Sequence, residues 1–199
     1  MIKIQSQLIA QLPDMARRVR KRFGRKTLRR TAYVGVLRLD SIRFRVYCEE
    51  KCPKNPTNQP VRASAMCRTK TIYIHRLAMK FDNLLIQQLL AHEIAHCLDP
   101  IPIKTMGKEK SSVDYMMSRK EVDAEVSALV HVLVPFLWKD VFARQQLREY
   151  LAGGNPFRLN KYPLLKPLDT GYVYIWINHG NTKAMGKLIY GIKKFLHLK

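Results

Sequence analysis

Residues 84–98 read LLIQQLLAHEIAHCL, and this stretch decides the fold. Its leucines and its two histidines recur at helical spacing, and Asp99 and Pro100 follow where such a helix should end. The β-branched and aromatic residues at 71–74 immediately before it predict a short strand. We therefore expect a strand that leads into a long helix with polar groups on an otherwise apolar surface.

The helix carries the pattern His-Glu-x-x-His at His92, Glu93 and His96. Imidazoles four residues apart lie on the same face of a helix and can share one Zn²⁺ ion, while the intervening Glu93 can reach a metal-bound water. The pattern thus predicts metal-assisted hydrolysis. The plain alternative is a pair of half-buried, hydrogen-bonded histidines with Glu93 in an ordinary surface ion pair.

A catalytic zinc site needs a third protein ligand. The next predicted helix begins at Ser118, and Glu121 is the preferred ligand because Ala124 on the same side allows close approach to the first helix. Ser118 and Glu121 also have the spacing of a capping box, which is a purely structural explanation. The competing ligands are Glu125, Asp99, Asp114 and Asp123.

Residues 71–135 resemble the gluzincin branch of zinc metallopeptidases, most closely the compact ImmA/IrrE-type and SprT-like proteins. The similarity rests on the strand, the segment LLAHEIAH, a loop, and Glu-x-x-Ala-x-x-x-Ala running to Pro135. It implies an α+β, zincin-like fold with the active-site helix packed on a small mixed sheet, and Zn²⁺ held by His92, His96 and Glu121. The stretch from Glu121 to Pro135 is one residue longer than in the nearest pattern. The four-cysteine ribbon of SprT-like proteins and the third histidine of metzincins are absent.

In the expected reaction, Glu93 takes a proton from the attacking water and passes it to the leaving amine. The developing oxyanion needs a donor besides the metal, and Tyr115 is the candidate. Asp99 or Asp123 could orient a ligand imidazole.

Basic residues dominate the two ends of the chain, whose formal net charge is +21. Residues 1–30 hold ten basic residues and one acid, residues 31–152 hold eighteen and thirteen, and residues 153–199 hold eight and one. We expect a basic N-terminal helical segment, a metallopeptidase domain and a basic C-terminal extension packed on it. The densest run predicts binding to a polyanion, most commonly nucleic acid, although an anionic membrane or an acidic protein would also fit. This run comprises Arg17, Arg18, Arg20, Lys21, Arg22, Arg25, Lys26, Arg29 and Arg30.

Other elements follow from local patterns. Residues 2–24 predict one basic amphipathic helix, and residues 32–47, with Asp40 and Ser41 at the turn, predict a hairpin with one solvent-exposed face. Residues 52–60 and 101–117 predict loops, and residues 172–177 predict a strand. Further helices are expected over 118–135, 138–151 and 184–198.

The four cysteines, Cys48, Cys52, Cys67 and Cys97, form no paired metal-binding motif. A second metal site completed by His75 or Cys97 is a weaker interpretation, and a disulfide is not expected without an export signal. We predict reduced thiols, with Cys97 buried beside the active-site helix.

Several classes of protein are excluded by the composition. The uncharged stretch 126–138 is shorter than the about 20 residues of a membrane span, and the N-terminus lacks a secretory pattern, so a cytoplasmic protein, associated with nucleic acid or a virion, is expected. The leading hypothesis is a zinc metallopeptidase acting on a protein or peptide at or near nucleic acid. One alternative is a non-catalytic nucleic-acid-binding or viral assembly protein that retains a zincin fold. Another is a latent peptidase that a partner opens.

Overall fold

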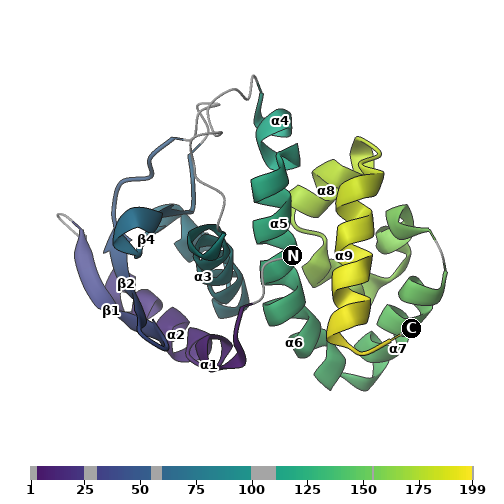
Figure 1. Cartoon of the computed structure of the whole chain (residues 1–199), viewed down its shortest axis with the longest axis horizontal. Coiled ribbons are helices and arrows are strands. Elements are labelled where there is room, and N and C mark those ends of the chain that lie inside the picture. The colour runs from purple at the N-terminus through teal and green to yellow at the C-terminus, as the bar shows by residue number, and fades with distance from the viewer. Residues whose placement is uncertain (1–3, 25–30, 55–59, 100–110, 154, 199) are drawn as a thin grey trace.

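A four-stranded mixed sheet forms one side of the molecule in the computed structural model, which describes residues 4–24, 31–54, 60–99, 111–153 and 155–198 (Figure 1). Its strands are β1 (Ala32–Leu39), β2 (Ile42–Glu49), β3 (Ala63–Met66) and β4 (Thr71–His75), in the order β1-β2-β4-β3. Only β2 and β4 pair in parallel. The predicted hairpin and the strand at 71–74 are confirmed. Strand β3 was not predicted, because its sequence ASAM has little strand propensity.

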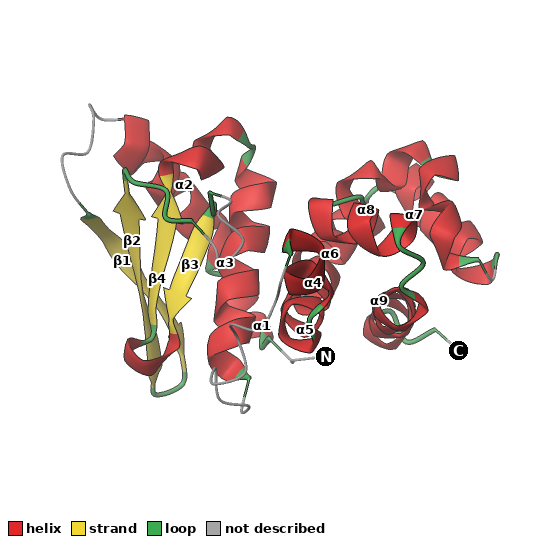
Figure 2. Cartoon of the chain, turned by 90° about the horizontal axis from the view of Figure 1, so that it is seen from above, coloured by secondary structure: helices red, strands yellow, loops and turns green. Residues whose placement is uncertain are grey.

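Helices α1 (Ser6–Ile9), α2 (Leu12–Gly24) and α3 (Asn83–Leu98) lie on one side of this sheet (Figures 1 and 2). Alternation along β2 turns Phe44, Val46 and Cys48 toward the helices, where all three are fully buried. The N-terminal segment forms two helices, not the single helix that we predicted, and Pro13 occupies the first turn of the second. Helix α3 agrees with the prediction and is capped by Asp82, whose side chain accepts a hydrogen bond from the Leu85 amide.

Helix α5 (Arg119–Ala128) lies in the middle of the molecule, between α3 and the C-terminal helices (Figure 2). All of its residues from 120 to 128 are buried. A π-helical turn, η4 (Leu129–Leu133), connects α5 to α6 (Val134–Lys139). Pro135 lies in the first turn of α6, so the helical segment continues past it. Before it, α4 (Ser112–Met117) occupies part of the predicted loop 101–117, because Ser111 caps a helix there; residues 101–110 lie outside the described part.

The C-terminal part is helical, with α7 (Val141–Ala152), η5 (Pro156–Lys161), η6 (Pro163–Leu168), α8 (Gly171–Asn178) and α9 (Thr182–Phe195). The predicted strand at 172–177 is wrong: this segment lies within α8. Thr170 caps the helix, and the buried residues Val173 and Trp176 are three apart, which is helical spacing. The tertiary environment thus outweighs the β propensity of Tyr172 and its neighbours.

The architecture is α+β, as predicted, with α3 packed between the sheet and α5. Basic helices occur toward both ends of the described chain, namely α2 and α9. Within the described ranges, no helix has both the length and the apolar character needed to cross a bilayer.

Candidate metal centre

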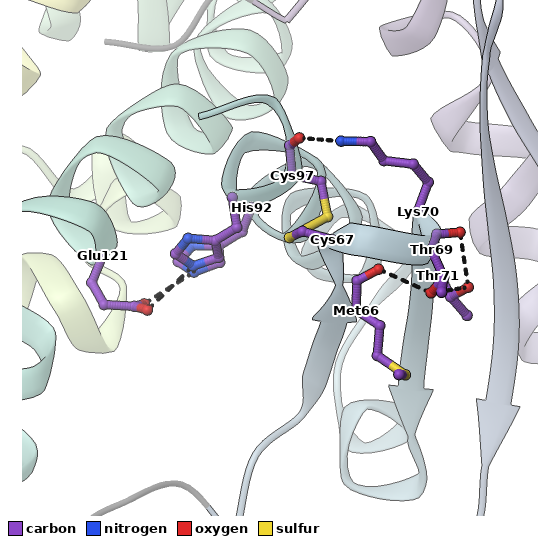
Figure 3. The surroundings of a disulfide bond; sticks show 9 residues. Met66, Cys67, Thr69, Lys70, Thr71, His92, Cys97 and Glu121 are labelled. Carbon is purple, nitrogen blue, oxygen red and sulfur yellow. Dashed lines mark hydrogen bonds and ion pairs between the residues drawn. A yellow bond between two sulfur atoms is a disulfide. The ribbon is translucent and has the colours of Figure 1, made fainter. Parts of the chain in front are cut away.

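Three side chains predicted as metal ligands meet between α3 and α5. His92 and His96 come from α3, and Glu121 comes from the first turn of α5. One ligand atom from each lies within 4.8 Å of the other two, and in the described residues this is the one group of at least three such side chains that could hold a metal ion. Figure 3 shows the His92 ring pointing across to the Glu121 carboxylate. Residues 25 positions apart are thereby brought to one point.

The separations are close to those expected around a tetrahedral metal. His92 Nε2 lies 3.0 Å from His96 Nε2 and 3.2 Å from Glu121 Oε2, and His96 Nε2 lies 3.2 Å from Glu121 Oε1. Two ligands about 2.0–2.1 Å from a tetrahedral zinc are about 3.3 Å apart. The two histidines present the same nitrogen to the same point, so the donor set fits a divalent ion.

The environment of Glu121 is a further indication of a metal site. The residue is fully buried, and its Oε1 atom has no hydrogen-bond partner among the residues that the structure describes, although His96 Nε2 is nearby. A buried carboxylate oxygen without a donor is costly, and a bound cation would satisfy it. The other oxygen, Oε2, accepts a hydrogen bond of 2.7 Å from the Tyr172 hydroxyl on α8.

Glu125 holds the other side of the His92 ring. Its Oε2 atom lies 2.9 Å from His92 Nδ1, while its Oε1 atom accepts hydrogen bonds from Gln88 at 2.7 Å and Thr170 at 2.8 Å. A carboxylate at Nδ1 leaves Nε2 available for a metal and fixes the ring orientation. Glu125 was considered as a ligand, and Asp99 or Asp123 as the orienting group. The geometry instead makes Glu125 the orienting carboxylate of His92.

The acids considered as alternative ligands occupy other positions. Asp99 is the C-terminal cap residue of α3, and Asp114 is an exposed residue of α4. Asp123 faces the C-terminal half, where its Oδ1 atom lies 2.7 Å from the Lys187 ammonium. Ser118 is the N-cap residue of α5, as predicted, but it makes no side-chain capping bond. Glu121 is directed to the histidines, so the capping-box alternative does not hold.

Glu93 is buried beside the two histidines, with 9% of its surface exposed. Burial raises the pKa of its carboxyl group, and the neighbouring His92 and His96 imidazoles offset this in part. A carboxyl group with a raised pKa is suited to accepting and returning a proton near neutrality.

The close contact between His92, His96 and Glu121 shifts the pKa values of His92 and Glu121. Burial acts to lower the pKa of His92, but hydrogen bonds and charge from Glu121 and Glu125 outweigh it and place this pKa well above its ordinary value. Burial acts to raise the pKa of Glu121, but His92 and His96 lower it far below the usual range. Hydrogen bonds and charge therefore couple the three groups, and a bound cation would displace any proton from the ligating imidazole nitrogens, because these must be bare.

Two tyrosines lie near the ligands. Tyr115, the predicted oxyanion donor, is half-buried on α4, near enough to Tyr172 to affect its pKa. Burial, followed by the charge of Glu121, raises the pKa of Tyr172 well above its ordinary value. The ring centroid of Tyr172 is 5.4 Å from that of His92. Sequence reasoning missed Tyr172 and Thr170, because they come from the segment misassigned as a strand and its flank.

The prediction of reduced thiols is wrong for Cys67 and Cys97, although Cys97 is buried as predicted. Cys97, which directly follows His96, forms a disulfide with Cys67 in η1 (Cys67–Thr69), across 30 residues of sequence (Figure 3). Cys48 and Cys52 are free. The second metal site is also not formed within the described residues: Cys67 and Cys97 are consumed by the bridge, and His75 contacts Ser64 at 2.9 Å and Glu49 at 3.2 Å.

The predicted polyanion-binding residues lie partly on α2. Arg17, Arg18, Lys21 and Arg22 are exposed there, and Asp14 pairs with the first two. Arg20 is half-buried and donates a hydrogen bond to the Phe81 carbonyl oxygen, so it has a structural role. Arg25, Lys26, Arg29 and Arg30 lie outside the described residues.

No family model, curated protein or solved structure matches this chain.

Proposed function

We propose that this chain is a zinc-dependent metallopeptidase with a zincin-like fold of the gluzincin type. The observation that carries the proposal is the convergence of His92, His96 and Glu121 within 4.8 Å in a largely buried site. Two imidazoles and one carboxylate are a donor set typical of catalytic zinc, which keeps a fourth position for water or substrate. A zinc ion bound there would lower the pKa of a water ligand toward about 7 and polarise the scissile carbonyl.

The chain's own groups would carry the proton. Glu93 lies next to both histidine ligands on α3, where its carboxylate would take a proton from the attacking water and deliver it to the leaving amine nitrogen. Glu125 and Tyr172 would hold His92 and Glu121 in place through their hydrogen bonds of 2.9 Å and 2.7 Å. Tyr115 remains our predicted oxyanion donor.

The sheet would provide a place for an extended substrate. Strand β3 is at the end of the strand order and packs near α3. An extended peptide can add to such an edge through main-chain hydrogen bonds, which would orient it along the active-site helix. We accordingly propose a protein or peptide substrate.

Metal content and hydrolysis test the proposal together. Protein purified without added metal should contain about one zinc per chain by elemental mass spectrometry, and His96→Ala should lose it. Glu93→Gln should retain zinc and lose hydrolysis of a quenched fluorescent casein substrate by at least about 100-fold. Asp114→Asn, an exposed acid on α4, is the matched control.

The outcomes distinguish the competing functions. A folded protein that neither contains nor takes up zinc would overturn the metallopeptidase. A zinc protein in which Glu93→Gln changes nothing would instead support the non-catalytic nucleic-acid-binding or assembly protein.

A further inference from the structure

The face of the sheet that points away from α2 and α3 is a separate surface from the candidate metal site. Both views show α2 and α3 on one side of the sheet, and no helix of the described chain on the other (Figures 1 and 2). Alternation places apolar residues of β2 inward and Arg43, Arg45 and Tyr47 outward. The open face therefore has a defined chemical character.

Three tyrosines form a row across this face. The strand register pairs Tyr33 with Tyr47 and Tyr47 with Tyr73, so the row crosses β1, β2 and β4. The rings of Tyr33 and Tyr47 meet edge-on with centroids 5.4 Å apart, and those of Tyr47 and Tyr73 are stacked at 5.7 Å. Tyr33 is 53% exposed, and Tyr47 and Tyr73 are half-buried by their neighbours. The three rings thus form one contiguous aromatic row, and Tyr33 at its end is the most exposed.

Arginines occupy the next rows along the same face. Arg45 is two residues from Tyr47, about 7 Å along the strand, and Arg38 and Arg43 pair in register one row further. All three are exposed. At the opposite end of β2, the Glu49 carboxylate is engaged by His75 at 3.2 Å. The face therefore combines an aromatic row with a flanking block of positive charge.

We propose that this open face, defined by Tyr33, Tyr47, Tyr73, Arg38, Arg43 and Arg45, binds single-stranded nucleic acid. Unpaired bases stack on exposed aromatic rings, and arginines beside the rings contact the phosphates. A base-paired duplex hides its base faces, and a lipid headgroup has none, so the tyrosine row favours a single strand. The proposal goes beyond peptidase activity and does not depend on it.

Binding of fluorescein-labelled (dT)15 and (rU)15, measured by fluorescence anisotropy at several salt concentrations, tests the proposal. Tyr33→Ala should weaken binding on the order of 10-fold without changing the salt dependence. The control is Tyr190→Ala on α9, which removes a tyrosine that is 63% exposed, and it should leave binding unchanged.

The charges are tested by a matched pair of double variants. Arg43→Gln/Arg45→Gln should reduce the slope of log K against log salt by about 1.4, since each phosphate contact on a single strand contributes about 0.7. Lys183→Gln/Lys194→Gln removes the same charge from exposed positions of α9 and should leave the slope unchanged. The pair separates this face from the general attraction of a chain with net charge +21.

Four results would overturn the proposal. The first is an equal loss of oligonucleotide affinity in the α9 control variants, and the second is equal affinity for a duplex of the same length. The third is binding to phosphatidylserine vesicles that depends on Arg43 and Arg45, without oligonucleotide binding. The fourth is self-association of the chain through this face, again without oligonucleotide binding. Glu93→Gln should bind the oligonucleotides as the wild type does, so failure of the peptidase proposal would not affect this one.

Discussion

At the scale of single residues, the candidate metal centre depends on hydrogen bonds that come from outside the motif. Glu125 accepts from Gln88 and Thr170 through one oxygen and contacts His92 through the other, so all of its partners here are donors. Because both carboxylate oxygens face donors, the site discriminates between a carboxylate and an amide of the same shape.

Glu125→Gln should therefore weaken zinc binding by about 10- to 100-fold. The glutamine amide would place its NH₂ group, a donor, opposite a group that also donates: Gln88, Thr170 or His92. If it faces His92 Nδ1, the imidazole proton moves to Nε2 and blocks the ligand atom. Competition with a chromophoric chelator measures the affinity. Glu149→Gln, an exposed acid on α7, should have no effect, and equal affinities in both variants would contradict the orienting role.

Tyr172 makes the corresponding contact to the carboxylate ligand. Its hydroxyl donates to Glu121 Oε2 at 2.7 Å within a buried environment. Tyr172→Phe removes that donor and leaves the ring in place, so the metal-free protein should lose about 1.5–3 kcal/mol of unfolding free energy. Urea denaturation measures the loss. Tyr174→Phe on the same helix is the control, since that ring is 59% exposed. Equal stability of the two variants would show that the contact to Glu121 contributes nothing.

At the scale of elements, local patterns predicted some parts and not others. Helix α3 and the β1–β2 hairpin were predictable because their apolar residues follow the period of one element. Strand β3 and helix α8 were not, since the first has a weak strand sequence and the second has aromatic and β-branched residues in a helix. Spacing indicated His92 and His96, and Glu121 was the preferred third residue among several acids, whereas Thr170 and Tyr172 reach this candidate site only through the tertiary fold.

The Cys67–Cys97 bridge is the clearest contact between elements that no pattern indicated. It ties the turn after β3 to the end of α3 and closes a loop across 30 residues of sequence. A loop of this length predicts about 3.5 kcal/mol of stabilisation relative to the reduced chain. Urea denaturation with and without dithiothreitol measures the difference.

A double variant provides the control for the disulfide. Cys67→Ser/Cys97→Ser should be insensitive to dithiothreitol, while the unreduced wild type should show two reactive thiols per denatured chain, Cys48 and Cys52. Four reactive thiols in the unreduced wild type would exclude the bridge.

At the scale of the whole molecule, α5 connects the two halves. It contacts α3 on the side of the sheet and α9 on the C-terminal side, and it carries both Glu121 and Glu125. The C-terminal half reaches the candidate metal centre through Thr170 and Tyr172, which hydrogen-bond to Glu125 and Glu121 respectively. Metal binding should for this reason stabilise both halves together.

A separate probe in each half can show this coupling. Trp138 and Trp176 lie in α6 and α8, whereas the backbone amides of β1, β2 and β4 report on the sheet. Zinc at 100 times its dissociation constant adds about 2.7 kcal/mol, which corresponds to a rise in Tm of about 5–10 °C for a chain of this size. The unfolding midpoint followed by tryptophan fluorescence should rise by this amount, amide hydrogen exchange in the three strands should slow in parallel, and EDTA should reverse both. A shift confined to one probe would mean that α5 does not couple the halves, and His96→Ala should show no shift with either probe.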